Sequence, residues 1–187
     1  VVDDIQYITS PYPNQARTIH TTFHIYKRDD PKFDESYALR LLDIFGFKPK
    51  MNMTKLSRGE VAVVYAIIGL AIKTKVTLFD EIELGMDDAL RMKFYEQVLL
   101  EQQNNPRTII ISTNIFTETQ TIFDEVKMMN QGMIVFEEQY QSVLEDYVII
   151  KSKTTDEFIM KNSLKTIQTQ YWYKSLLKKN DIKNNTN

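Results

Sequence analysis

The chain has 187 residues, of which 43% are hydrophobic and 26% charged, enough for one globular domain with a core. It contains no cysteine, which excludes disulfides and thiolate metal sites and suits a reducing compartment. The formal net charge of −2 is uneven, because eight lysines and three acids in residues 151–187 give that stretch +5 and leave −7 on residues 1–150. Such a basic stretch could contact a membrane surface, a nucleic acid or an acidic partner, but for residues 178–187 a solvated and partly disordered tail is the simpler interpretation.

The first part of the chain predicts one short strand followed by helices. Residues 4–8 resemble a strand, and Pro11 and Pro13 break the loop after it. Residues 15–73 are expected to be mainly helical, since apolar residues recur at helical spacing in residues 33–47. The uncharged run at residues 61–72 is shorter than the roughly 20 residues that span a bilayer, so it predicts a buried helix.

From residue 75 onward, predicted strands and helices alternate. The expected order is a buried strand, an amphipathic helix, a second buried strand, a helix, a hairpin around Gln131 and Gly132, and a short helix; the ranges are 75–79, 87–103, 107–113, 115–126, 126–138 and 140–147. Alternation of this kind predicts an α/β fold with a parallel sheet and helices on both sides.

Two acids, Asp80 and Glu81, follow the buried strand at its carboxyl end, where ligands bind in open α/β sheets. A carboxylate there can hold Mg²⁺ through water, and a second one can orient or deprotonate an attacking water. Both tasks belong to phosphoryl transfer. Acids also end strands simply by meeting solvent, and this pair taken by itself favours that reading.

The helix that precedes this strand begins with the sequence LSRGE. Ser57 can cap the helix, Gly59 lets the backbone approach a ligand, and the helix dipole favours an anion such as a terminal phosphate. Taken alone, Ser57 and Glu60 form an ordinary capping box.

The combination, in this order, resembles the nucleotide-binding subunit of ATP-binding-cassette (ABC) transporters. LSRGE resembles the signature loop, VTLFDE the Walker B strand, IELGMD the D-loop, TIIISTN the strand leading to the switch loop, VKMMNQGMIVFEE the following hairpin, and IQYITSPYP the strand and Q-loop. The resemblance covers roughly residues 4–146 and implies a P-loop NTPase core with a helical subdomain. It assigns the following positions: Ser57, Arg58, Gly59 and Glu60 to the signature loop, Asp80 to the metal side, Glu81 to catalysis, Gly85 and Asp87 to the D-loop, Asn114 to the switch and Ser10 to the Q-loop.

Three features depart from the family pattern. No glycine is followed by lysine, so the phosphate-binding Walker A loop is absent, and residue 1 is expected to fall inside the domain. Asn114 replaces the switch histidine; it can donate a hydrogen bond but cannot carry charge. Ser10 stands where the family has the Q-loop glutamine, and Gln15 lies too far along to substitute. The last two changes suggest a slow or degenerate ATPase site.

The resemblance implies an ATP-binding and ATP-hydrolysing subunit that uses ATP and Mg²⁺ and powers a membrane transporter. It implies a nucleotide-sandwich homodimer or heterodimer and an integral membrane permease as partner, with no nucleic acid, at the cytoplasmic face of the cell membrane. The isolated chain is expected to be inactive. The expected segments are the core strand and Q-loop, the helical subdomain ending in the signature motif, the Walker B and switch half, and a basic extension, at residues 1–14, 15–74, 75–150 and 151–187.

Two other readings stay open. One is a degenerate, non-hydrolysing regulatory or binding module of the same fold, favoured by Asn114 and Ser10 and opposed by the acid pair Asp80 and Glu81. Another is a family member acting on ribosomes or DNA ends, but such proteins carry two cassettes or long coiled coils. His20 and His24, without a third ligand, are interpreted as surface or cleft residues.

Overall fold

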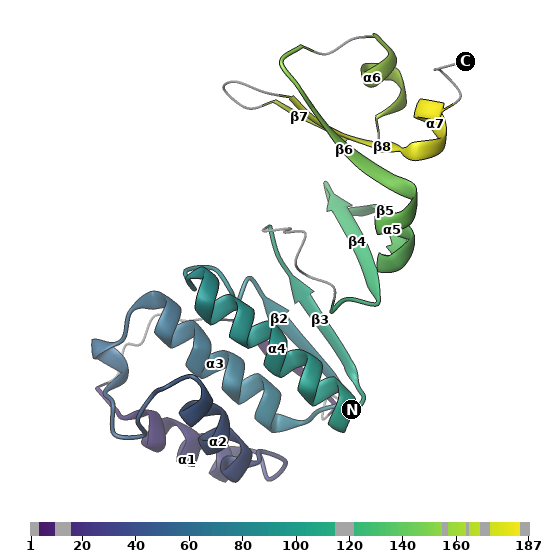
Figure 1. Ribbon diagram of the computed structural model, residues 1–187. Helices are drawn as coiled ribbons and strands as arrows, with labels where there is room; N and C mark the ends of the chain where they lie inside the picture. The colour runs from purple at the N-terminus through teal and green to yellow at the C-terminus, as the bar shows by residue number, and fades with distance from the viewer. Residues whose placement is uncertain are drawn as a thin grey trace. The chain divides into compact units, whose positions relative to one another are not determined.

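The structure is a computed structural model that describes residues 4–9, 16–114, 122–154, 157–163, 165–168 and 173–183. It consists of two compact units, Val1–Gln120 and Thr121–Asn187 (Figure 1). The division falls inside the segment 75–150 that the sequence suggested as one half of an ATPase core. Among the residues described, no helix combines the length and apolar character needed to cross a bilayer.

Three helices occupy the predicted helical region of the first unit, and this prediction is confirmed. They are α1 (Ile19–Asp29), α2 (Glu35–Ile44) and α3 (Arg58–Ile72), with a 3₁₀ turn at Met53–Lys55 before α3. Each helix begins at a side chain that accepts a backbone N–H, and these caps are Thr18, Asp34 and Ser57. Helix α3 is buried along almost its whole length, which explains its uncharged run.

Strands β1 (Ile5–Ile8), β2 (Val76–Asp80) and β3 (Thr108–Ser112) form the predicted parallel sheet, in the order β1-β2-β3. Helix α4 (Asp88–Asn104) connects β2 to β3. Tyr7 lies opposite Leu78, and Asp80 lies opposite Ser112, so the strands end at one edge of the sheet. The acid pair Asp80 and Glu81, at the carboxyl end of β2, therefore lies at that edge.

Helices α3 and α4 pack on the same face of this sheet. The ring of Phe79 in β2 meets the ring of Phe94 in α4 edge to face, with 5.4 Å between centroids. A Cβ atom at Gly69 in α3 would lie only 2.5 Å from the Phe79 ring, so glycine allows α3 to approach the sheet closely.

The opposite face of the sheet is open among the residues described. Ile5, Tyr7 and Ile110 are exposed by 52%, 57% and 49%. The second layer of helices expected on this face is not formed by the described part of the chain, because both helices that pack on the sheet lie on the Phe79 side.

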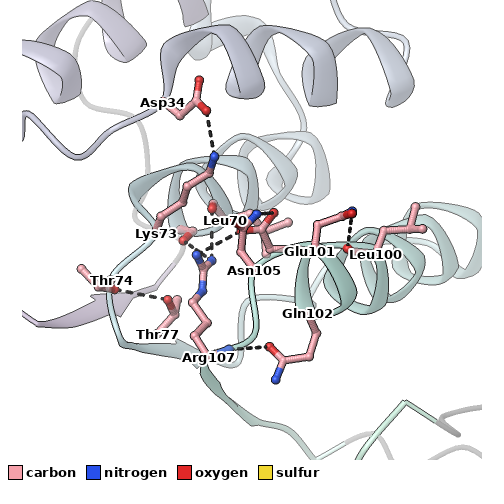
Figure 2. Close-up of polar contacts among 12 residues, drawn as sticks. Asp34, Leu70, Lys73, Thr74, Thr77, Leu100, Glu101, Gln102, Asn105 and Arg107 are labelled. Atoms are coloured by element: carbon pink, nitrogen blue, oxygen red, sulfur yellow. Dashed lines mark hydrogen bonds and ion pairs between the residues drawn. The ribbon is translucent and has the colours of Figure 1, made fainter.

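A buried ion pair closes the first unit at the edge of the sheet away from the acid pair (Figure 2). Arg107, just before β3, donates to Glu101 Oε1 over 3.1 Å, with only 5% and 2% of the two side chains exposed. The same guanidinium donates to the carbonyl oxygen of Leu70 over 3.1 Å, near the end of α3. Lys73, in the left-handed conformation after α3, pairs with Asp34 over 2.8 Å.

The second unit holds two antiparallel sheets. Strands β4 (Glu125–Asn130) and β5 (Met133–Gln139) form the predicted hairpin, with Gln131 and Gly132 both at positive φ, and α5 (Tyr140–Asp146) follows as expected. The remaining elements make a sheet in the order β6-β8-β7 with two short helices: β6 (Tyr147–Ser152), α6 (Glu157–Asn162), β7 (Lys165–Gln168), β8 (Tyr173–Lys178) and α7 (Lys179–Lys183).

Two expectations for this unit need correction. The helix predicted for residues 115–126 lies mostly outside the described residues, and its last two residues belong to β4, where they pair with β5. The solvated, partly disordered tail expected for residues 178–187 is regular as far as it is described, because Lys178 ends β8 and α7 follows it directly. Within β8, the alternate residues Ser175 and Leu177 form the buried face of the strand.

Candidate active site

Asp80 ends β2 with both carboxylate oxygens hydrogen-bonded to hydroxyl groups. Ser112, opposite it on β3, donates to Oδ1 over 2.5 Å, and Tyr7 on β1 donates to Oδ2 over 2.5 Å. The Ser112 hydrogen bond, followed by that of Tyr7, lowers the pKa of Asp80 below its ordinary value. Three adjacent strands thus hold one ionised and oriented carboxylate at the edge of the sheet.

Glu81 is presented differently from its neighbour. Its backbone has a φ of +45°, a left-handed conformation that is uncommon for residues other than glycine. Its N–H donates to the carbonyl oxygen of Ser112 over 3.1 Å, which anchors the turn to β3, while its side chain is exposed. The anchored turn thus presents the Glu81 carboxylate to solvent directly after β2.

The start of α3 forms the capping box that the sequence predicted. The Ser57 N–H donates to Glu60 Oε2 over 2.7 Å, and the Glu60 N–H donates to Ser57 Oγ over 3.2 Å. The side chains of Ser57 and Glu60 therefore serve the helix itself. Ser57 and Arg58 are exposed to solvent.

Gly59 has a packing role that the sequence did not indicate. A Cβ atom there would lie 2.3 Å from the carbonyl oxygen of Gly85, so only glycine lets the start of α3 contact the turn after β2. Gly85 itself has a φ of +96°, which favours glycine. Asp87 ends this turn by accepting the Leu90 N–H over 2.8 Å as the cap of α4.

Glu83 lies in the same turn and is buried, with 1% of its surface exposed. Its carboxyl group accepts hydrogen bonds from the hydroxyls of Thr113 and Tyr95. Burial raises the pKa of Glu83, while the Thr113 hydrogen bond and the charge of Arg91 act in the opposite direction.

No family model matches the chain. The iron(III) import ATP-binding proteins FbpC of Mannheimia succiniciproducens and FbpC 1 of Haemophilus influenzae are 36% and 35% identical over 98 residues. The match covers 52% of this chain and 28% and 30% of those proteins. The yeast CCR4-associated factor 16 is 25% identical over 123 residues, covering 66% of this chain and 43% of that protein.

Solved structures of similar fold include the ATP-binding subunit of an ABC transporter, with a TM-score of 0.64 at 15% identity over 76% of this chain and 62% of that chain. Another is cbiO1 from Clostridium perfringens, with a TM-score of 0.59 at 19% identity over 76% of this chain and 60% of that chain. This chain has the fold of an ABC-type nucleotide-binding domain. It spans less than a third of the FbpC proteins that it matches.

Within this ABC-type fold, the structure brings Asp80, Glu81, Ser112 and Asn114 to one edge of the sheet, since Asn114 follows Ser112 by two residues and is exposed. The predicted Q-loop position, Ser10, lies outside the described residues. His20 and His24 are exposed on α1, as expected. No group of three or more metal-binding side chains occurs among the described residues.

Sequence reasoning missed three residues of the ABC-type edge. Ser112 and Tyr7 were read as parts of strands, although their positions opposite and beside the end of β2 followed from a parallel register. Glu83 carried a signal that was overlooked, namely a third acid four residues before the cap Asp87, inside a turn with two buried apolar residues, Ile82 and Met86.

Proposed function

We propose that this chain forms the Walker B, D-loop and switch side of an ATP-hydrolysing site in a protein that powers a membrane ABC transporter. The observation that carries the proposal is the contrast at the end of β2. Asp80 is ionised and fixed by two hydroxyl donors, and Glu81 is exposed on an anchored left-handed residue. One carboxylate is thereby suited to the metal side, and the other to polarising a water.

The donors at this edge suit Mg²⁺ held through water. Asp80 supplies hard carboxylate oxygens, with the hydroxyl of Ser112 beside them. Mg²⁺ sheds its waters reluctantly, so Asp80 would contact the ion through water, and the nucleotide phosphates would ligate it directly. Bound there, Mg²⁺ would neutralise charge on the phosphates. The chain's own contribution is to orient Asp80 and to place the Glu81 carboxylate where it can accept a proton from water.

The similarity to transporter ATP-binding proteins supports the cellular setting that we propose. In this setting, the protein lies on the inner face of the cell membrane and works with an integral membrane permease. Two ATP-binding subunits, identical or different, close around the nucleotide. Each subunit offers its exposed signature residues, Ser57 and Arg58, to the ATP held by the other.

Hydrolysis is tested by the Mg²⁺-dependent ATPase rate of the full-length protein and its Glu81→Gln variant. Turnover should fall by about 10²–10⁴-fold while ATP binding is retained, because the variant loses the base but keeps its size. The matched control is Glu96→Gln, which removes an exposed carboxylate on α4 and should leave the rate unchanged. Equal rates for wild type and Glu81→Gln would contradict the role of Glu81.

Dimer closure is tested by light scattering with Mg-ATP in the Glu81→Gln background. Arg58→Glu places an anion on the exposed signature loop without adding a Cβ atom against Gly85, so it should prevent the ATP-dependent dimer. Lys55→Glu makes the same charge change at an exposed site in the preceding turn and should leave the dimer intact. A dimer that persists with Arg58→Glu would contradict a role in trans.

A second candidate function is a regulatory module of the same fold that binds nucleotide without hydrolysing it. Asn114 favours this candidate, because it lies at the switch position without an ionisable group. An ATPase assay distinguishes the two candidates, because the regulatory module requires that the wild-type protein bind ATP without turnover.

A further inference from the structure

Glu83 is a buried carboxyl group that the proposed chemistry does not use. It lies between Glu81 and Gly85 in the turn after β2, and only 1% of its surface is exposed. Burying a carboxyl group is costly unless its oxygens find hydrogen bonds. Both oxygens have such partners, Thr113 on one and Tyr95 on the other.

These two hydroxyls come from different elements, so Glu83 links three segments. Thr113 directly follows β3 and precedes Asn114, whereas Tyr95 is a buried residue of α4. The turn that carries Glu83 is itself braced by backbone hydrogen bonds from Leu84 N–H to the Glu81 carbonyl and from Met86 N–H to the Glu83 carbonyl, each 3.0 Å long. The turn after β2 and the end of β3 are thus tied through one side chain.

The contact between Glu83 and Thr113 lies beside the residues of the candidate active site. Glu81 lies two residues before Glu83, and Asn114 lies one residue after Thr113. A further link between these segments runs through the Ser112 carbonyl and hydroxyl, which both accept the Glu81 N–H over 3.1 Å. The Glu83 contact thus adds a side-chain attachment between the turn and the segment beyond Ser112.

We infer that Glu83 is a positioning residue, whose carboxyl group fixes the segment carrying Asn114 relative to the turn carrying Glu81. The inference deepens the proposed function and rests on it. Burial raises the pKa of Glu83, whereas the hydrogen bond from Thr113 and the charge of Arg91 act to lower it. A misplacement of about 1 Å at a reacting group can cost about 100-fold in rate.

The test removes the hydroxyl of Thr113 and keeps its shape, using Thr113→Val in the full-length protein. We expect kcat for ATP to fall about tenfold or more, with KM for ATP unchanged, because substrate contacts remain and only the placement of Asn114 is lost. Thr113→Ser, which restores a hydroxyl, should recover most of the rate. The control is Thr108→Val, the same change at the exposed opposite end of β3.

A second readout needs no nucleotide. Hydrogen–deuterium exchange of the backbone amides in residues 82–86 should be at least several-fold faster in Thr113→Val than in wild type or Thr108→Val. Should Thr113→Val fail to fold, Tyr95→Phe removes the other hydroxyl and is measured in the same way.

These readouts separate the inference from the proposed function. A wild-type protein without ATPase activity would overturn the proposed function, and the exchange measurement would then decide whether Glu83 ties the turn to β3. With an active wild type, a kcat within twofold of normal in Thr113→Val overturns the positioning role. Unchanged exchange in residues 82–86 overturns it as well.

Discussion

Charged side chains are bound differently at the two edges of the β1-β2-β3 sheet where the parallel strands begin and end. At the edge where Arg107 enters β3, a cation meets Glu101 with almost no exposure of either side chain, and the guanidinium also binds carbonyl oxygens near the end of α3 (Figure 2). At the edge where β2 ends, Asp80 is held by neutral hydroxyls, and Glu81 faces solvent.

The difference separates groups that stabilise the fold from groups left available for chemistry. A buried carboxylate paired with a cation is neutralised within the fold and cannot attract a ligand. A carboxylate held by hydroxyl donors is oriented and ionised, yet its charge is still uncompensated. The Arg107 edge should therefore dominate stability, and the Asp80 edge should dominate activity.

The largest expected effect on stability comes from breaking the pair at the Arg107 edge. Arg107→Met leaves Glu101 buried without a cation and should lower the free energy of unfolding by about 3–5 kcal/mol. Denaturant unfolding measures this change. The exposed pair of Lys75 and Asp4 provides the control, since Lys75→Met should have little effect.

The double variant Arg107→Met/Glu101→Leu sharpens the same prediction. Because both charges are removed together, most of the lost stability should return. A double variant as unstable as Arg107→Met would mean that packing of the arginine, and not its charge, closes this edge.

A smaller effect on the free energy of unfolding is expected at Gly59, where the start of α3 packs closely against the backbone of the turn after β2. Alanine usually stabilises a helix relative to glycine by about 1 kcal/mol. Here Gly59→Ala should instead destabilise by about 1–3 kcal/mol, because its Cβ atom would meet the Gly85 carbonyl at 2.3 Å. A stabilised Gly59→Ala protein, measured by the same unfolding method, would show that the turn does not contact α3.

The smallest effect concerns the titration of Asp80. Ser112→Ala should raise the pKa of Asp80 back toward its ordinary value, and Tyr7→Phe should raise it less, because the Ser112 hydrogen bond lowers it most. NMR titration of the Asp80 carboxyl carbon measures both. The folded protein lowers this pKa, so the small associated stability is present above the unfolded pKa and is lost as the pH falls through the folded value.

Much of the fold could be predicted because local signals agreed with the tertiary structure. The uncharged run became the buried helix α3, the short apolar runs became β2 and β3, and the Gln131–Gly132 turn closed the hairpin. The C-terminal sheet was missed because β6 pairs with β8 across the intervening α6 and β7, and because lysines mask the alternation of these strands.

Only part of the candidate site could be predicted from the sequence, for a related reason. Asp80 and Glu81 could be identified from the sequence as two acids at the end of a predicted strand. The hydroxyl donors Ser112 and Tyr7 belong to other strands, so only the sheet register identifies them. Gly59 was assigned to ligand approach, but its contact with Gly85 emerges only when α3 and the turn after β2 are placed together.

The central claim is tested most directly by measuring stability and turnover in the same Glu81→Gln protein. The account predicts that the free energy of unfolding stays within about 0.5 kcal/mol of wild type, as for other surface substitutions, while ATP turnover falls at least about 100-fold. A Glu81→Gln protein that keeps its turnover, or that loses as much stability as Arg107→Met, would contradict the division of the sheet into a stabilising and an active edge.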